Sequence, residues 1–193
     1  MERNIDIEIW QKLKAGKASA FSYIFDTYFD QLVDYGCRFT KDRQLVKDAI
    51  QDLFLELTRK GNQLSDVDNI IAYLLKATRR RIVRLMNQNN RIENTEELEV
   101  FDLEYDTLQE SEVWEKKLNL IAQALNQLPP RQKEVIYLKF YKGVSNSEAS
   151  EIMNISYQSV GNLIQKALNK LKESLDEPMQ AILFFFQNRL KHT

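Results

Sequence analysis

The chain has 193 residues, 44% of them hydrophobic and 28% charged, with only five Gly and three Pro. This length suits one medium domain or two small ones, and the scarcity of turn-forming residues favours a helical protein over disorder or an all-β fold. A single Cys and a single His exclude an intramolecular disulfide and a zinc cluster, so we expect no metal and no cofactor. Cys37 follows a helical apolar pattern, and we interpret it as a core residue rather than a redox sensor.

The net charge of −1 is unevenly distributed along the chain. Residues 1–90 hold 15 Lys/Arg and 12 Asp/Glu (+3), residues 91–112 hold 1 and 9 (−8), and residues 113–193 hold 11 and 7 (+4). Two basic blocks therefore flank an acidic segment. This asymmetry hints at nucleic-acid contacts by the two ends, although most charge clusters are simply solvated faces.

The ends of the chain predict a cytoplasmic location. The N-terminal residues MERNIDIEIW are charged and lack the apolar core of an export signal. The apolar run Ala181–Phe186 is far too short to span a bilayer.

Helical periodicity dominates the first half. Apolar residues at steps of three, four and seven predict a helix from about residue 19 to 39, and a second stripe runs through residues 45–57. Gly61 is expected to end this second helix as its C-cap. Residues 61–68 have the composition of a loop, from which Ser65 or Asp68 can cap a helix carrying apolar residues 70–85. With a short helix near residues 5–13, the pattern predicts a bundle of about four helices.

The second half predicts a helix-turn-helix. Residues 91–112 interrupt the periodicity and are interpreted as an acidic linker. A helix then runs from about residue 113 to Leu128, and Pro130 opens another that reaches Tyr141. Two closely spaced helix starts follow: a capping box, in which Glu148 comes three residues after its cap, and a Ser-led start near residue 156. We therefore expect an all-α protein of two small helical domains, of which the C-terminal one holds a helix-turn-helix.

Both halves resemble one family. Residues 125–175 contain Leu-Pro-Pro-Arg-Gln at the start of the apolar-rich helix that reaches Tyr141. They resemble the domain that recognises the −35 element in extracytoplasmic-function (ECF) sigma factors of RNA polymerase. The segments KDAIQDLFL, Ala-Tyr-Leu and KATRRR resemble the −10 domain of the same family. The resemblance implies the following division: 1–90, polymerase binding with −10 recognition and melting; 91–112, linker; 113–175, −35 recognition; 176–193, an apolar tail.

The resemblance implies a polymerase-docking face on the helix through residues 45–57. Asp48, Gln51 and Asp52 share one side of this helix by their spacing. The family uses this face to dock on the large polymerase subunit, and the alternative is a solvated surface. Phe54 is expected in the core.

The loop and helix that follow carry the implied −10 contacts. The loop corresponds to the family element that captures a flipped base, and Asn62, Gln63 and Asn69 can read a base edge. Tyr73 either stacks on a base or packs internally.

A basic stripe follows on the same predicted helix. Lys76, Arg80 and Arg84 are spaced by four, and Arg79 and Arg81 broaden the stripe. Like charges at this spacing repel, so phosphate binding explains them better than a solvated face.

The implied −35 contacts lie on the second helix of the helix-turn-helix. Ser156 caps this helix, and Gln and Asn side chains can pair with adenine edges while Lys binds phosphate or guanine. The candidates are Arg131, Tyr157, Gln158, Ser159, Asn162, Gln165 and Lys166. Gly161 departs from the Arg or Lys that the family usually has.

Nothing in the sequence supports an enzyme. It shows no Gly-rich phosphate loop, no available His for a triad and no catalytic constellation, so no catalytic residue and no small-molecule substrate are expected. The resemblance implies core RNA polymerase and promoter DNA as partners, with an anti-sigma factor that is often membrane-anchored. The alternatives are a stand-alone helix-turn-helix regulator and a pure protein-interaction module. The tail near residues 179–191 either caps the second domain or forms a partner site.

Overall fold

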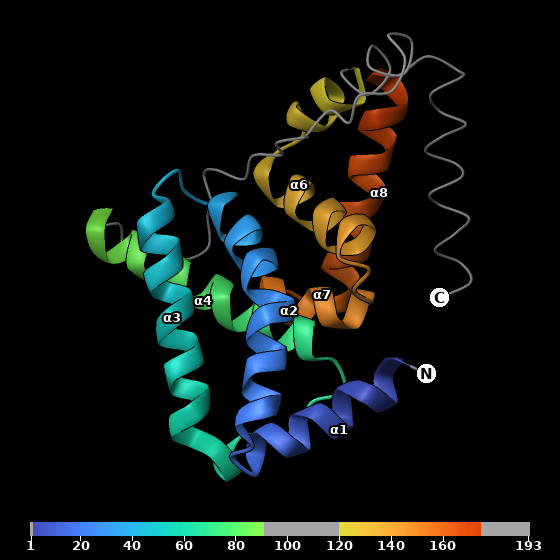
Figure 1. The fold of residues 1–193 in the computed structure, drawn as a ribbon. Helices are drawn as coiled ribbons and strands as arrows, with labels where there is room; N and C mark the ends of the chain where they lie inside the picture. The colour runs from blue at the N-terminus through green and yellow to red at the C-terminus, as the bar shows by residue number, and fades with distance from the viewer. Residues whose placement is uncertain (1, 91–119, 175–193) are drawn as a thin grey trace, which may run out of the picture. The chain divides into compact units, whose positions relative to one another are not determined.

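The protein folds as two compact helical units. A computed structural model describes residues 2–90 and 120–174, and it divides the chain into units Met1–Leu98 and Glu99–Thr193 (Figure 1). Within the described residues every regular element is helical and no strand occurs, which confirms the expected all-α class. The linker 91–112 and the tail 176–193 lie outside the described residues, and the functional division of the chain stays a prediction.

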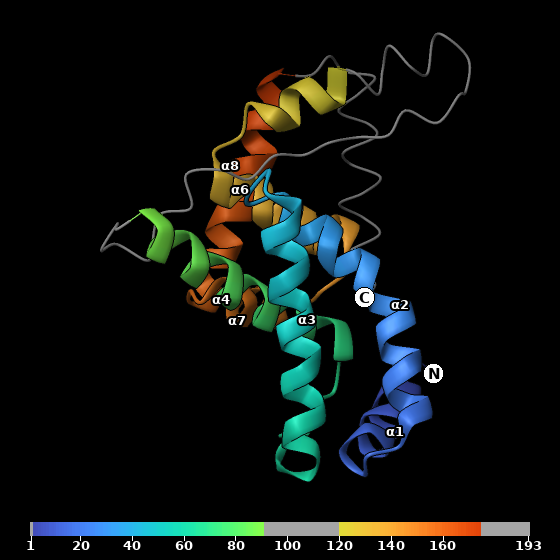
Figure 2. The same cartoon turned by 60° about the vertical axis from the view of Figure 1, so that its left-hand side comes forward.

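The first unit is a bundle of four helices with one short 3-10 turn. Its elements are α1 (Glu2–Lys14), α2 (Ala18–Cys37), α3 (Arg43–Lys60), η1 (Gly61–Gln63) and α4 (Ile70–Asn90). Helices α2 and α3 lie side by side, α4 contacts both, and α1 contacts α2 and η1 (Figures 1 and 2). The helices expected from the periodicity are all present.

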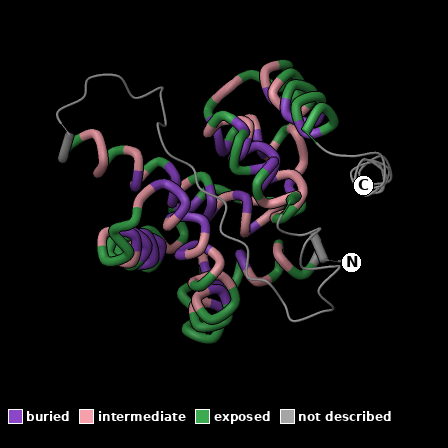
Figure 3. Tube along the Cα trace, turned by 90° about the horizontal axis from the view of Figure 1, so that it is seen from above, coloured by how far each residue is buried: buried purple, intermediate pink, exposed green. Residues whose placement is uncertain are grey.

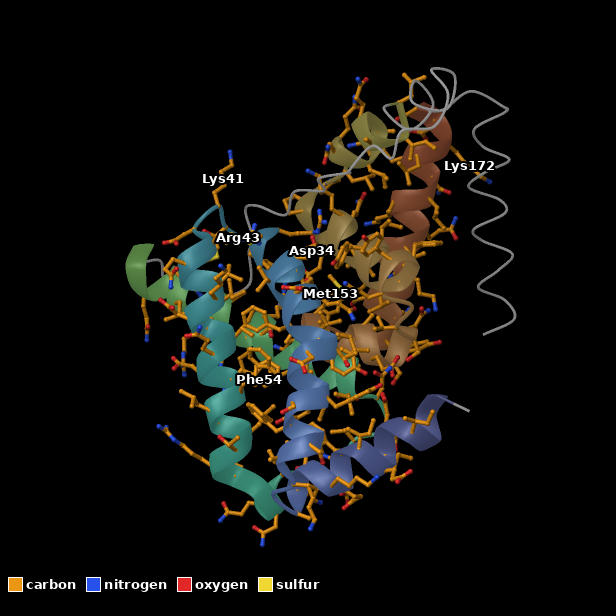
Figure 4. All side chains as sticks on the ribbon, in the orientation of Figure 1. Asp34, Lys41, Arg43, Phe54, Met153 and Lys172 are labelled. Atoms are coloured by element: carbon orange, nitrogen blue, oxygen red, sulfur yellow. The ribbon has the colours of Figure 1, made fainter. Side chains whose placement is uncertain are left out.

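Aromatic rings fill the space between α2 and α3. Figure 3 shows buried positions alternating with exposed ones along each helix, as expected for amphipathic helices. Phe54 of α3 is only 2% exposed, and Figure 4 shows it among the side chains between α3 and α2. Its ring packs edge-to-face on Phe21 and Phe25, with centroid distances of 5.8 and 5.0 Å. Phe54 is therefore a core residue, as predicted. Cys37, at the end of α2, is half-buried.

Gly36 allows the three long helices to approach one another closely. A Cβ atom at this position would lie 2.5 Å from Val46 Cγ1 and 2.7 Å from Ile82 Cδ1. A side chain there would require the side chains of Val46 and Ile82 to move, so the tight packing at this point depends on a glycine that lies inside a helix.

The boundaries of the loop between α3 and α4 confirm one prediction and correct another. Gly61 ends α3 as predicted, with a φ of 47° and its N–H donating to Leu57 O. The start of α4 is capped neither by Ser65 nor by Asp68. Asn69 Oδ1 accepts the N–H of Ala72 at 3.1 Å instead, because Asn69 directly precedes the first helical residue.

The second unit contains the predicted helix-turn-helix. Its described elements are a helical stretch at residues 120–126, α6 (Pro130–Ile136), the π-helical segment η2 (Tyr137–Tyr141), α7 (Asn146–Met153) and α8 (Tyr157–Ser174). Helix α8 contacts both α6 and α7 (Figure 2). The single helix expected to reach Tyr141 changes to π geometry after Ile136, with the N–H of Lys142 donating to Tyr137 O at 3.1 Å.

Local capping fixes the turn between α7 and α8. The predicted capping box is present: Glu148 N donates to Ser145 Oγ at 3.2 Å, and Ser145 N donates to Glu148 Oε2 at 2.6 Å. Asn154 ends α7 in the left-handed conformation, with a φ of 53°. Ser156 then caps α8 by accepting the N–H of Ser159 at 3.1 Å, as predicted.

Candidate functional site

The exposed face of α3 brings together the three predicted docking residues. Asp48, Gln51 and Asp52 are all exposed, opposite the buried face of the helix. Gln44 Nε2 donates to Asp48 Oδ1 at 2.8 Å. Leu55, three residues after Asp52, is 52% exposed and extends the same face. Leu55 was not predicted as part of this face, although its position in the helical spacing could have indicated it.

The loop at residues 61–69 presents two of its three predicted base-reading residues. Asn62 and Gln63 lie in η1 and are exposed. Asn69 is half-buried, and its carboxamide oxygen is already used to cap α4. The exposed amides of Asn62 and Gln63 can each donate and accept hydrogen bonds, which is what reading a base edge requires.

Helix α1 holds this loop through side chains that the sequence analysis did not single out. Trp10 is fully buried, and its Nε1–H donates to Ser65 O at 2.8 Å. Gln11 Nε2 and Lys14 Nζ both donate to Asp66 Oδ1, at 2.7 and 2.5 Å. The hydrogen bond from Lys14, with a smaller one from Gln11, lowers the pKa of Asp66 below its usual value.

Tyr73 packs within the first unit. Its half-buried ring lies edge-to-face against the Trp10 indole, with a centroid distance of 5.0 Å. The geometry therefore accounts for its internal packing, and base stacking by Tyr73 stays a prediction.

The basic stripe of α4 contains fewer cations than the sequence predicts. Lys76, Arg80 and Arg84 are exposed, as expected for side chains spaced by four on one helix face. Arg79 is only 9% exposed, so it lies away from this stripe.

Arg81 pairs with Glu56 of α3 and does not belong to the exposed stripe. Glu56 accepts a hydrogen bond from Arg81 Nη2 and forms an ion pair with Lys60 at 2.6 Å. The hydrogen bond from Lys60, together with the charges of Arg81 and Arg80, lowers the pKa of Glu56. Three of the five predicted cations thus form the exposed stripe. Helix periodicity could have excluded Arg79 from the stripe. The sequence gives no sign, however, that Arg81 pairs with Glu56 on another helix.

The outer face of α8 is polar and accessible. Tyr157 is 63% exposed, and Val160 and Ala167 are buried on the opposite side. The other exposed candidates on this helix are Gln158, Asn162, Gln165 and Lys166. Gly161 lies on the same open face, where an added Cβ would meet nothing within 4 Å.

Two predicted −35 residues are less accessible. Ser159 is half-buried, and its Oγ lies 2.8 Å from Ser156 Oγ within the helix cap. Arg131 is half-buried in the first turn of α6. The other five candidates are exposed, and base reading by any of the seven stays a prediction.

An aromatic pair marks the π-helical segment before the helix-turn-helix. Tyr137 is buried and Tyr141 is 66% exposed, and their rings stack with a centroid distance of 5.1 Å. Lys142 Nζ lies 5.5 and 5.2 Å from the two ring centroids. Helical spacing could have indicated the Tyr137–Tyr141 pair, since residues four apart are neighbours on one helix face, but the sequence gives no sign of the change to π geometry.

The described residues hold neither a metal-binding cluster nor a helix able to cross a membrane. Residues 2–90 and 120–174 contain no group of three or more His, Cys, Asp and Glu side chains arranged to hold a metal ion. In the same ranges, no helix combines the length and apolar character needed to cross a membrane.

The chain is similar in sequence to known sigma factors. The family model described as Sigma-70, region 4 matches residues 118–171, which include the helix-turn-helix. RNA polymerase sigma factor SigZ of Bacillus subtilis is 25% identical over 79% of this chain and 85% of its own length. ECF RNA polymerase sigma factor SigK of Mycobacterium ulcerans is 22% identical over 86% and 91%. ECF RNA polymerase sigma factor BldN of Streptomyces coelicolor is 24% identical over 89% and 66%.

Proposed function

We propose that the chain is an ECF-type RNA polymerase sigma factor, which binds core RNA polymerase and directs promoter-specific transcription initiation. One observation carries the proposal: a helix-turn-helix with an exposed polar second helix stands in a chain that aligns over most of its length with sigma factors. The protein supplies specificity and has no catalytic role of its own. Its place of action is the cytoplasm, where the polymerase works.

The face of α3 made by Asp48, Gln51, Asp52 and Leu55 is the proposed site of polymerase docking. Its exposed carboxylates can pair with basic residues of a partner, and the exposed Leu55 offers the partner an apolar contact. Charged residues at the rim of such an interface steer association and select the partner.

Promoter DNA contacts are divided between the two units. We assign the −10 element to Asn62 and Gln63 for base reading and to the stripe of Lys76, Arg80 and Arg84 for phosphates. The −35 element is assigned to the outer face of α8, where Gln158, Asn162 and Gln165 can pair with base edges in the major groove. These exposed residues are carried on helices or on a loop with side-chain anchors, as base reading requires.

An anti-sigma factor is the proposed regulator. Such a partner would cover the docking face of α3 and so compete with core polymerase. The α3 variant described below should then lose binding to both partners. Retention of inhibitor binding by that variant would place the inhibitor on another surface.

The decisive experiment adds the purified protein to core polymerase with a library of promoters. We expect initiation from a defined set of −35 and −10 sequences, and loss of both initiation and polymerase binding in the double variant Gln51→Ala/Asp52→Ala. The matched control is Asp26→Ala/Asp30→Ala, which removes two exposed acids spaced by four on α2 and should leave initiation intact. Tight binding of the free protein to a duplex site, with no polymerase binding, would instead establish the stand-alone regulator.

A second measurement tests the basic stripe. Each phosphate contact that is removed lowers the slope of log affinity against log salt by about 1. Lys76→Gln, Arg80→Gln and Arg84→Gln should each reduce this slope for promoter DNA. Arg79→Gln should not, because Arg79 lies away from the stripe.

A further inference from the structure

The loop at residues 61–69 is connected to a helix that lies far from it in sequence. Residues on α1 contact its middle, and they are separated from their partners by 52 to 55 positions. Asp6 of α1 also accepts the N–H of Ile70 at 3.1 Å, where the loop joins α4. Four side chains of α1, which are Asp6, Trp10, Gln11 and Lys14, therefore hold the loop at its middle and at its end.

Trp10 is the centre of this arrangement. Its indole is fully buried, its N–H is used by the carbonyl of Ser65, and its ring lies against Tyr73 in the first turns of α4. A single side chain thus fixes the loop backbone to the helix that carries the basic stripe. The buried donor is satisfied by the loop carbonyl, so movement of the loop would leave a polar N–H unpaired in the interior.

Asp66 is a second, exposed anchor. Its side chain is 73% exposed, yet the same oxygen accepts from both Lys14 and Gln11. These two hydrogen bonds lower the pKa of Asp66 below its usual value, because they stabilise the ionised carboxylate. The anchored residues Ser65 and Asp66 follow the exposed pair Asn62 and Gln63 closely in the chain.

We infer that α1 positions this loop for recognition of an unpaired −10 nucleobase. Extruding a base costs a few kcal/mol, and a loop that must also order itself on binding loses further free energy. Anchoring the loop in advance lets Asn62 and Gln63 meet the base without that ordering. Trp10, Gln11, Lys14 and Asp66 are positioning residues that do not touch DNA. The inference rests on the proposed function and adds to it the element that sets −10 specificity.

A merely structural role for these contacts predicts a different result. If α1 only stabilised the first unit, its variants would lose activity equally on all promoters and in proportion to lost stability. A positioning role predicts loss of discrimination between −10 sequences in protein that remains folded. The ratio of initiation from a preferred promoter to initiation from one with a substituted −10 base separates the two roles.

The test uses the full chain with core polymerase and two variants. Asp66→Ala removes the exposed anchor, and Trp10→Phe keeps an aromatic ring but removes the N–H donor. Glu8→Ala is the matched control, because it breaks an exposed ion pair with Lys12 on the same helix and touches no loop residue. We expect Trp10→Phe, which removes one hydrogen bond, to lower the −10 discrimination ratio about fivefold. Asp66→Ala, which removes two exposed hydrogen bonds, should lower the ratio as well. Duplex binding to the −35 element should stay unchanged, as should the ratio in Glu8→Ala.

A readout without polymerase keeps the inference separate from the proposed function. Backbone hydrogen exchange, followed by mass spectrometry, should become faster in peptides covering residues 62–66 in both variants and not in Glu8→Ala. Two results would overturn the positioning role. One is hydrogen exchange that is the same in the variants as in wild type. The other is a discrimination ratio that is the same in the variants as in a wild type that initiates. A wild type that fails to initiate at all would overturn the proposed function, while the exchange result would still decide whether α1 orders the loop.

Discussion

The two candidate DNA-reading elements are held in place in opposite ways. The start of α8 is fixed by its own neighbours, since Ser156 binds Ser159 three residues away. The loop at residues 61–69 is fixed by α1, through partners 52 to 55 positions distant. The reading helix of the second unit is therefore built from local sequence, whereas the loop of the first unit depends on the tertiary fold. Damage far from the loop in sequence should affect −10 recognition, while only nearby changes should affect the start of α8.

The largest effect is expected from Trp10→Ala. Removing a fully buried indole leaves a cavity and deletes the anchor of the loop, and such changes cost about 3–5 kcal/mol. Urea unfolding of the first unit, followed by circular dichroism, measures the loss. The second unit should keep its unfolding midpoint. A loss below about 1 kcal/mol would show that the bundle does not depend on this contact.

The next effect tests the close approach of α2, α3 and α4. In Gly36→Ala the new methyl group would lie within 2.7 Å of side-chain carbons on both neighbouring helices. Overpacking of this kind costs about 1–3 kcal/mol, and we expect that loss in the free energy of unfolding. If Gly36→Ala were instead stabilising, as alanine usually is in a helix, the bundle would be looser than the structure shows.

The same division between local and distant contacts explains what the sequence could predict. Helix positions, the cap of α3 at Gly61, the capping box at Ser145 and the cap at Ser156 depend on residues within one turn of each other. Periodicity and cap spacing are sufficient to find them. The helix-turn-helix and its accessible residues followed from these local signals.

Most of the parts that were missed depend on contacts between elements. The cap of α4 at Asn69 is the exception, because its partner Ala72 lies only three residues away. Arg81 is paired with Glu56 of a neighbouring helix, and Trp10 anchors a loop that lies far along the chain. Spacing along one helix does not contain this information. The π-helical turn at Tyr137 was missed for a related reason, because a local change of hydrogen-bond register leaves the apolar pattern almost unaltered.

A moderate effect is expected from a change in the capping box of α7, which is a local contact. Ser145→Ala removes the capping-box acceptor of α7 and should cost about 1 kcal/mol in the stability of the second unit. Thermal unfolding of the two units, compared with wild type, checks this. Ser147→Ala is the control, because Ser147 is exposed and does not cap the helix. An equal loss in both variants would mean that the capping box is not what stabilises α7.

A gain is expected at Gly161. This glycine lies on the open face of α8, and no atom would contact an added Cβ, so Gly161→Ala should stabilise the helix by up to about 1 kcal/mol. Duplex binding to the −35 element separates two roles for the glycine. Unchanged affinity in Gly161→Ala, with a gain in Gly161→Arg, would mean that the natural residue only weakens binding. A loss in Gly161→Ala would mean that the DNA backbone approaches the helix closely at this point.

The smallest effect is expected at a contact of intermediate sequence separation, which joins α3 to α4 across 25 positions. Glu56 has a lowered pKa, so the folded state favours its ionised form, and its contribution to stability is present above the unfolded pKa near 4.5. That contribution is lost as the pH falls through the lower folded value. Since Glu56 is 44% exposed, we expect Glu56→Gln to cost less than about 1 kcal/mol at pH 7. Urea unfolding of both proteins from pH 7 down to pH 3 should show the difference in their free energies of unfolding shrinking as the pH falls below 4.5. A difference that stays constant with pH would mean that Glu56 acts through packing and not through its charge.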